Sequence, residues 1–206
     1  MKKKILLFDL DDTLINSKLR QYEVVKSFAK SNRIKAFYSY EEYLEKRKSN
    51  NFSNKQLLSL ESGCIINIVE FENYWNQNIE SASFLEYDKP YLEKKILQEY
   101  KNINDSEWGI ISLRTNIKNA DSQLVKFGFD KLFDLHFFLP HNNNINPKIR
   151  QIEDLKEVYE IIGLVGDSKI DKEAANVNGI NFFAVETGLY KLDCDVFTLE
   201  EILKTI

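Results

Sequence analysis

The sequence predicts an α/β fold, a doubly wound parallel sheet interrupted by an inserted all-helical segment. From residue 90 onward, apolar runs of strand length alternate with amphipathic runs of helix length. Such alternation favours a parallel sheet with helices on both faces. Between residues 15 and 89, strand-like runs are scarce and apolar residues recur at helical spacing. Acidic residues directly follow one early and one late apolar run, which is where open α/β sheets bind ligands.

The first predicted strand, residues 5–8, is a short apolar run that leads straight into DLDDT at residues 9–13. This places three carboxylates at the end of a buried strand. Carboxylates this close repel one another strongly when poorly solvated, unless a cation or a proton lies between them. The run therefore predicts a divalent-metal and nucleophile site built on Asp9 and Asp11.

Residues 15–89 are predicted to form an all-helical insertion. The first helix is indicated by apolar residues that share one helical face, at positions 22, 25, 28 and 29. Ser39, with Glu42 three residues later, forms a capping-box pattern that opens a second helix. Further helices are expected after a cap at Ser53 or Asn54 and over residues 65–79.

The second half of the chain is predicted to supply the remaining strands and helices of the sheet. Pro90 suits the first turn of a helix, and Gly128 suits a C-cap, where a left-handed conformation is common. Strands are expected at residues 108–113, 135–139, 161–165 and 180–185, and helices at residues 118–127, 149–159, 172–177 and 199–204.

A second acidic run, GDSKID at residues 166–171, directly follows the apolar strand predicted at residues 161–165. Gly166 permits a tight turn out of the strand, and Asp167 and Ser168 suit the N-terminus of the next helix. Two acidic strand ends can converge on a single ion. One or two carboxylates, with water and phosphate oxygens, form the ligand set that Mg²⁺ prefers.

These runs resemble the motifs of the haloacid dehalogenase-like hydrolases. DLDDT resembles the family's first motif, DxDxT, and GDSKID resembles the fourth, GDSxxD. Ser112, which ends an apolar strand, fits the second motif. The third motif is a lysine, best matched by Lys148, although Pro147 precedes it where the family often has a following proline; Lys156 is a second candidate. All four motifs occur in the family's order and span essentially the whole chain.

The resemblance implies a Rossmann-like catalytic core at residues 1–14 and 90–206. It implies a helical cap of the family's first type at residues 15–89. Hinges near residues 16–17 and 87–89 would join the cap to the core. Cap closure would exclude water from the site during reaction.

The resemblance also implies a phosphatase that works through an aspartyl-phosphate. Asp9 would be the nucleophile, and Asp11 would be the general acid and base. Mg²⁺ would be held by the Asp9 side chain, the Asp11 backbone carbonyl and Asp167. Ser112 and Lys148 would bind the remaining phosphoryl oxygens.

Supporting roles follow from the same resemblance. The Thr13 hydroxyl would help to hold the Asp9 loop, and Asp171 would orient Lys148 or support the metal site. Arg114 follows the second motif closely and could bind a second anionic group of the substrate. Asp12 is expected to be a turn residue. His136 and His141, the only two histidines, are isolated in the sequence and are not expected to be catalytic.

Composition and charge narrow the class of partner and the compartment. The net charge of −4 and the lack of a basic run beyond residues 2–4 argue against a nucleic-acid-binding surface. The first residues lack the pattern of a signal peptide, so none is expected, and no apolar run approaches the roughly 20 residues of a membrane span. Cys64 and Cys194 are expected to be free thiols, consistent with the cytoplasm.

We expect a small phosphorylated metabolite, a sugar phosphate or a nucleotide, as substrate. The oligomeric state stays open.

Several functions remain compatible with these residues. A phosphomutase would return the phosphoryl group to the substrate, and a non-catalytic binding protein would keep the fold without turnover. Dehalogenation needs neither the metal nor a second acid, so Asp11 and Asp167 disfavour it. Phosphonate cleavage would need a Schiff-base lysine, and no cap lysine stands out. A nucleotidase would need to stack its base on a cap aromatic such as Tyr74 or Trp75.

Overall fold

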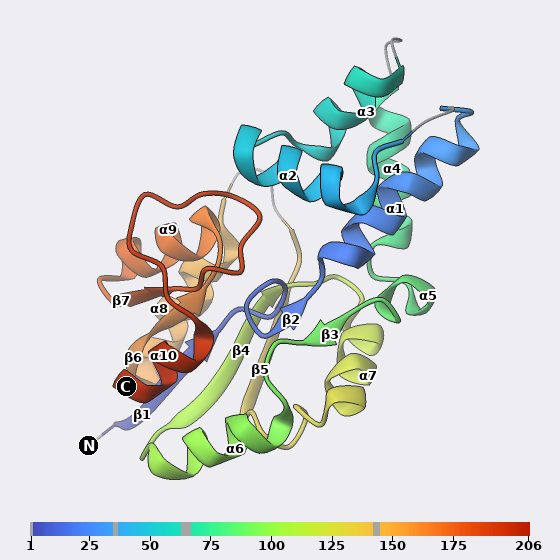
Figure 1. The fold of residues 1–206 in the computed structure, drawn as a ribbon. Helices are drawn as coiled ribbons and strands as arrows, with labels where there is room; N and C mark the ends of the chain where they lie inside the picture. The colour runs from blue at the N-terminus through green and yellow to red at the C-terminus, as the bar shows by residue number, and fades with distance from the viewer. Residues whose placement is uncertain (1, 35–36, 63–66, 142–144) are drawn as a thin grey trace. The chain divides into compact units, whose positions relative to one another are not determined.

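The chain forms two compact units (Figure 1). The computed structural model describes residues 2–34, 37–62, 67–141 and 145–206. The first unit, called the core unit below, comprises Met1–Asn16, Pro90–Gly188 and Leu192–Ile206. The second, called the helical unit, comprises Ser17–Lys89 together with Leu189–Lys191.

The core unit is built on a five-stranded sheet in which every neighbouring pair of strands is parallel. In sheet order the strands are β5 (Leu135–Leu139), β4 (Glu107–Leu113), β1 (Lys3–Phe8), β6 (Tyr159–Gly166) and β7 (Asn181–Ala184). Figure 1 shows blue β1 between green β4 and orange β6, so segments far apart in sequence lie side by side. The predicted α/β fold with a parallel sheet is confirmed.

Helices cover both faces of this sheet. Alternate residues of β1 point to opposite faces: Leu6 and Phe8 join one apolar cluster, and Ile5 and Leu7 join another. All four side chains are fully buried, and burial of each contributes about 1.5–3 kcal/mol. The first cluster includes residues of α6 (Lys94–Ile103), α7 (Ile117–Phe127) and α10 (Leu199–Thr205), and the second includes residues of α8 (Pro147–Val158) and α9 (Lys169–Asn178). The sheet is therefore doubly wound, as predicted.

The prediction that Pro90 opens a helix is wrong. Pro90 ends the short strand β3 (Lys89–Pro90), which pairs with β2 (Ile15–Asn16) in a two-stranded sheet. The chain stays extended there because the backbone N–H of Tyr91 donates to the carbonyl of Leu14, with 2.9 Å between the atoms. Proline is tolerated at the end of an edge strand, where no N–H is needed. The helix α6 begins only at Lys94.

Most other predicted elements are confirmed, with boundaries that differ by a few residues. The C-cap at Gly128 has the predicted left-handed backbone, with φ of 72°. The helix expected to end at Tyr159 ends one residue earlier, because Tyr159 already pairs with Lys3 as the first residue of β6. Boundary errors of this size are typical, since helix ends are set by capping contacts as well as by periodicity.

The helical unit contains α1 (Lys18–Ser31), α2 (Tyr40–Asn50), α3 (Asn54–Ser62), α4 (Ile68–Asn78) and α5 (Ala82–Leu85). The predicted capping box at α2 is confirmed: Glu42 N donates to Ser39 Oγ at 3.3 Å, and Ser39 N donates to Glu42 Oε2 at 2.8 Å. Aromatic contacts join α1 to α4, with the Phe28 ring centroid 5.1 Å from that of Phe71 and 5.4 Å from that of Tyr74.

Residues 189–191, which follow β7 in the sequence, pack with the helical unit. Arg47 is buried in this unit. Its Nη2 donates to the Tyr190 hydroxyl at 2.8 Å, and its guanidinium lies 5.0 Å from the centroid of the Tyr190 ring. Arg47 Nη1 also donates to Tyr43 Oη at 2.8 Å and to Asn54 Oδ1. The Tyr190 segment is therefore held to α2 and α3 by one arginine.

Two predictions involve residues outside the described part of the chain: the start of the fourth helix at Ile65 and the thiol of Cys64. Cys194 is a free and exposed thiol. No helix in the described ranges is both long and apolar enough to cross a bilayer.

Candidate active site

The strand register brings the acidic runs to one edge of the sheet. Phe8, the last residue of β1, is paired with Ile110 of β4 and with Val165 of β6. Pairing continues one residue further, because Asp9 N donates to the Val165 carbonyl at 2.8 Å. Asp9, Ser112 and Asp167 therefore emerge at the carboxyl ends of three adjacent strands, the usual ligand-binding edge of such sheets.

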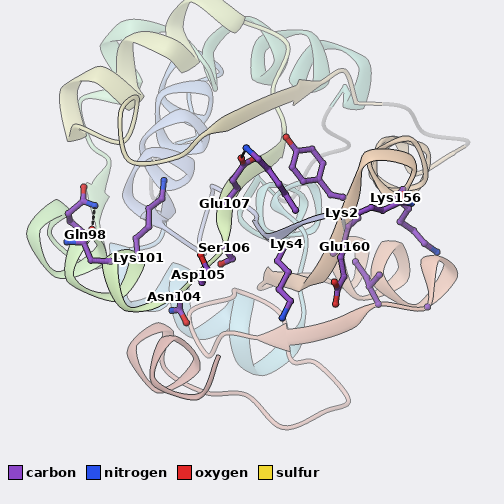
Figure 2. Close-up of a pocket in the computed structure, with 16 residues that line it drawn as sticks. Lys2, Lys4, Gln98, Lys101, Asn104, Asp105, Ser106, Glu107, Lys156 and Glu160 are labelled. Atoms are coloured by element: carbon purple, nitrogen blue, oxygen red, sulfur yellow. Dashed lines mark hydrogen bonds and ion pairs between the residues drawn. The ribbon is translucent and has the colours of Figure 1, made fainter.

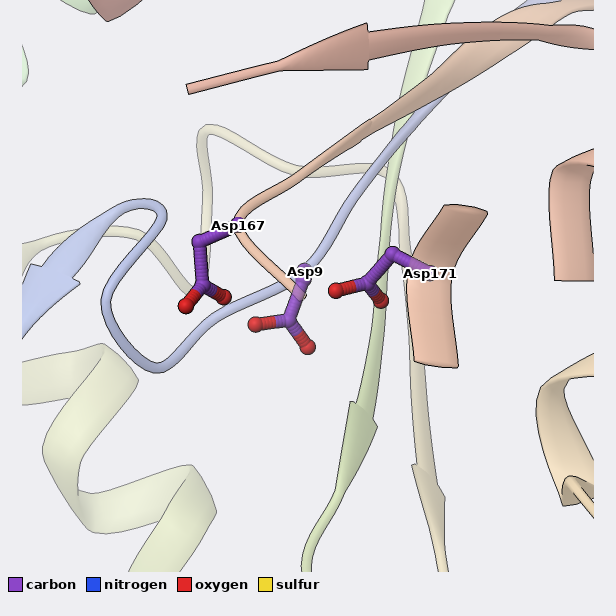
Figure 3. Close-up of side chains that lie close together, drawn as sticks. All are labelled: Asp9, Asp167 and Asp171. Carbon is purple, nitrogen blue, oxygen red and sulfur yellow. The ribbon is translucent and has the colours of Figure 1, made fainter. Parts of the chain in front are cut away.

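Three carboxylates converge at this edge. Asp9, Asp167 and Asp171 each offer one oxygen, and these oxygens lie within 4.8 Å of one another. Figure 3 shows the Asp9 carboxylate between the other two, with Asp171 contributed by α9. Oxygen atoms at this spacing form a donor set that suits a hard divalent cation. The Asp11 side chain does not belong to this cluster and has another partner.

Lys148 lies against the same carboxylates. Its Nζ is 2.5 Å from Asp9 Oδ1 and 2.6 Å from Asp171 Oδ1, and the residue is only 2% exposed. Asp171 is fixed in turn by the capping box of α9, since its Oδ2 accepts from Ser168 N at 3.1 Å and from Ser168 Oγ at 2.5 Å. Asp171 thus links the helix cap to the lysine, and the lysine to Asp9.

The two candidate lysines lie at opposite ends of the sheet. Lys156 Nζ donates to the Asn178 carbonyl at 2.7 Å, and Lys156 borders a surface depression beside the first residues of β1, β4 and β6 (Figure 2). The depression also contains several lysines, but some already have acidic partners there: Lys3 pairs with Glu107 at 2.6 Å. Only Lys148 of the two is brought to Asp9.

Burial sets the protonation of the carboxylate cluster. It raises the pKa of Asp9 to about 7, against the opposing charge of Lys148. Burial also raises the pKa of Asp167 well above its usual value, with added repulsion from Asp12, Asp9 and Asp171. Burial alone would lower the pKa of Lys148, but the charges of Asp171 and Asp9 outweigh it and raise that pKa. The cluster therefore favours a bound proton or cation near neutral pH.

Asp11 is paired with Arg114, which follows β4. Arg114 Nε donates to Asp11 Oδ2 at 2.6 Å, and Arg114 Nη2 donates to Asp11 Oδ1 at 2.7 Å. Nη2 also donates to Gln123 Oε1 on α7, at 3.1 Å. The sequence suggested that Arg114 could bind a substrate anion; in the structure its guanidinium contacts the side chain of the second acidic residue of the first motif.

The loop after β1 is held by two threonines. Asp12 has a left-handed backbone, with φ of 57°, and its N–H donates to the Ile15 carbonyl at 2.6 Å. Thr187 Oγ1 donates to the Asp12 carbonyl, and Thr13 Oγ1 donates to Asp167 Oδ1 at 3.4 Å. Asp12 is thus part of a turn, and Thr13 contacts the second acidic run.

Sequence reasoning missed three residues of this site: Gln123, Thr187 and Gly188. A Cβ atom on Gly188 would lie only 2.6 Å from the Asp167 carbonyl oxygen, so no larger residue fits without moving the backbone. Thr187 and Gly188 come shortly after β7, at the same edge of the sheet, and a glycine at that place was an available signal. Gln123 gives no local signal, because it lies on a helix among other polar residues.

Comparison with known proteins agrees with this geometry. The sequence profile of a family described as haloacid dehalogenase-like hydrolase matches residues 6–185. No curated protein sequence matches the chain.

Solved structures show the same fold. A haloacid dehalogenase-like hydrolase from Streptococcus pneumoniae is 16% identical, with a TM-score of 0.71 over 98% of this chain and 97% of its own. A predicted phosphoglycolate phosphatase from Haemophilus somnus is 20% identical, with a TM-score of 0.71 over 100% and 98%. A predicted phosphatase from Clostridium acetobutylicum is 15% identical, with a TM-score of 0.70 over 100% and 98%. The profile match over most of the chain, together with the shared fold, confirms the resemblance: the chain belongs to the haloacid dehalogenase-like hydrolases.

Proposed function

We propose that this hydrolase is a Mg²⁺-dependent phosphatase that cleaves a small phosphorylated metabolite through an aspartyl-phosphate. The observation that carries the proposal is the pairing of Asp9 with Lys148 inside a cluster of three carboxylates. A buried carboxylate beside a lysine suits a nucleophile that must meet a phosphate dianion without being repelled.

The proposed reaction has two steps. In the first, an Asp9 carboxylate oxygen attacks phosphorus, and the ester oxygen leaves with a proton from Asp11. In the second, Asp11 takes a proton from water, which attacks phosphorus, releases phosphate and restores the Asp9 carboxylate. Splitting hydrolysis in this way replaces one difficult displacement with two easier ones.

The other site residues bind the phosphoryl group. The Ser112 hydroxyl would donate a hydrogen bond to one phosphoryl oxygen, and Lys148 would bind another by charge. Asp171 keeps Lys148 in place through the 2.6 Å contact. The all-oxygen donor set fits Mg²⁺, which would be held by Asp9, the Asp11 backbone carbonyl and Asp167. Bound Mg²⁺ would supply positive charge between the nucleophile and the phosphate.

The proposal assigns the choice of substrate to the helical unit. We propose that this unit is a cap that excludes water and selects the substrate, a sugar phosphate or a nucleotide. Similar solved structures include predicted phosphoglycolate phosphatases, so a phosphorylated hydroxy acid also belongs among the test substrates. Tyr74 donates to Ser27 Oγ at 2.8 Å, and Trp75 packs against Phe71. Both rings therefore pack inside the helical unit, and this packing does not favour a nucleotide base stacked on them.

We propose that the protein acts in the cytoplasm.

The test is phosphate release from a panel of phosphate monoesters, with Mg²⁺ and with a chelator in its place. We expect metal-dependent release, with one substrate class preferred. Conversion of a sugar phosphate into its isomer without phosphate release would instead indicate a phosphomutase. Neither product from any ester, with Mg²⁺ still bound, would indicate a non-catalytic binding protein.

The stabilising effect of Mg²⁺ is expected to depend on pH. The folded-state pKa of Asp9, about 7, exceeds the ordinary value of 3.8, so the metal-free fold binds a proton that the unfolded chain releases. The contribution of Asp9 to the free energy of unfolding is therefore greatest below about pH 4, and this contribution is lost as the pH rises through about 7. Mg²⁺ binds the ionised cluster, so it should raise Tm more at pH 8 than at pH 6. Equal shifts in thermal scans at the two pH values would contradict this prediction.

The close approach of Gly188 to Asp167 predicts a specific defect in the variant Gly188→Ala. Because the added Cβ would meet a backbone oxygen at 2.6 Å, the Asp167 loop must move. We expect the Mg²⁺ concentration for half-maximal activity to rise by about tenfold, an effect of about 1.4 kcal/mol on metal binding. Gly179→Ala is a control for a methyl group added away from the site: a Cβ there meets nothing within 4 Å, and its left-handed backbone, with φ of 63°, should cost Tm but leave the Mg²⁺ requirement unchanged. An unchanged Mg²⁺ requirement in Gly188→Ala would show that the loop absorbs the methyl group.

A further inference from the structure

The contact between Asp11 and Arg114 is a two-point contact. Both Asp11 oxygens accept from the guanidinium, at 2.6 Å and 2.7 Å. A planar fork of this kind fixes the plane of the carboxylate as well as its position, which a single ammonium group cannot do. The Asp11 side chain is 27% exposed.

Arg114 is itself held firmly. It is 2% exposed, and its Nη2 also donates to Gln123 Oε1, a buried side chain of α7. Its backbone N–H donates to the Ser112 carbonyl at 3.2 Å, in the turn that follows β4. The residue that contacts Asp11 and the residue proposed to bind phosphate are thus two positions apart on one turn.

A purely structural role explains this arrangement poorly. Burying a guanidinium costs several kcal/mol in desolvation, and a hydrophobic residue of similar volume often stabilises a fold as well or better. Arg114 instead fixes the orientation of one carboxylate, that of Asp11 in the first motif. The geometry points to Arg114 as the residue that positions the Asp11 carboxyl for proton transfer to and from the oxygen atoms of substrate and water. This inference rests on the phosphatase function proposed above.

The inference predicts that the effect of removing Arg114 depends on the leaving group. A positioned acid matters most for an alkyl ester, whose oxygen needs a proton in order to leave, and least for an aryl ester such as p-nitrophenyl phosphate. The measurement is the rate of the first step, taken from pre-steady-state single turnovers of both esters with Mg²⁺ present. For Arg114→Gln we expect the alkyl rate to fall by about 10- to 100-fold, the scale of a misplaced catalytic group. We expect the alkyl-to-aryl rate ratio to fall at least about tenfold, with little change in KM.

Three further variants separate positioning from folding. Asp11→Asn should show the same dependence on the leaving group, and the double variant should be no worse than the poorer single one, because both remove one function. Arg114→Lys keeps the charge but not the fork, so it should recover only part of the alkyl rate. Arg150→Gln removes an exposed arginine of α8 and should behave as wild type.

Each contrary outcome has a distinct meaning. Equal losses for both esters with a raised KM would show that Arg114 binds a substrate anion, which overturns the inference while leaving the phosphatase proposal intact. Wild-type rates in Arg114→Gln would overturn it as well. If the wild-type protein turns over neither ester, the proposed function fails, and the inference fails with it. Thermal scans of every variant identify loss of fold, and in that event Arg114→Lys supplies the comparison.

Discussion

Phosphate release by the Asp9→Asn variant is expected to fall at least about a thousandfold below wild type. An amide is not a nucleophile toward phosphorus, so the aspartyl-phosphate cannot form and only residual catalysis by binding groups remains. The substitution keeps the size of the side chain, and it removes a carboxylate whose pKa burial raises to about 7. The variant should therefore fold, and its Tm near neutral pH should be at least that of the metal-free wild type. Steady-state phosphate release at saturating Mg²⁺, alongside thermal scans, makes both comparisons.

The matched control for this variant is Asp121→Asn, which changes an exposed aspartate of α7. It should retain the wild-type rate within about twofold, as surface substitutions usually do. An Asp9→Asn protein that folds and keeps more than a tenth of the wild-type rate would contradict the assignment of Asp9 as the nucleophile.

The second large effect is expected from Lys148→Met. This change removes the charge proposed to bind the phosphoryl group, and loss of one such group typically costs about 10²- to 10³-fold in kcat. It also removes the cation that lowers the pKa of Asp9. Without that cation the pKa of Asp9 should be higher, so the acidic limb of the kcat/KM profile should move to higher pH, because the nucleophile must be ionised.

Lys156→Met supplies the control that distinguishes the two lysines. Lys156 donates to the Asn178 carbonyl and borders the opposite edge of the sheet, so its loss should change the rate by no more than about twofold. A large loss in Lys156→Met with little loss in Lys148→Met would reverse the assignment. The pH profile adds a second criterion, since only the lysine that contacts Asp9 can move its acidic limb.

Local signals account for the elements that could be predicted from the sequence. Apolar runs predict the strands, and Ser39 with Glu42 predicts the N-cap of α2. Both patterns depend only on residues within a few positions of one another. Pro90 misled the prediction for the opposite reason. Its conformation suits a helix, yet a hydrogen bond from Tyr91 to Leu14, some 77 positions earlier in the chain, keeps this segment extended.

The candidate site also combines features that local sequence predicts with features that depend on the fold. The acidic runs could be identified as motifs, since each carries its chemistry in consecutive residues. Which side chains meet could not be read there, because the pairing of Asp11 with Arg114 depends on the register of β1 and β4. The choice between two lysines likewise depends on which end of the sheet α8 delivers each of them to, and the sequence offers both with equal charge.

The Tyr190 segment limits how this protein could be taken apart or recombined. The chain passes between the two units after Asn16, Lys89, Gly188 and Lys191, so the helical unit is not an insertion with only two cut points. A chimera that exchanged residues 17–89 alone would lose the buried arginine that holds Tyr190. Exchange of the helical unit as a module would therefore have to include the loop after β7. That loop also contains Gly188, which lies close to Asp167. The loop after β7 thus supplies Tyr190 to the helical unit and Gly188 beside the carboxylate cluster of the core unit.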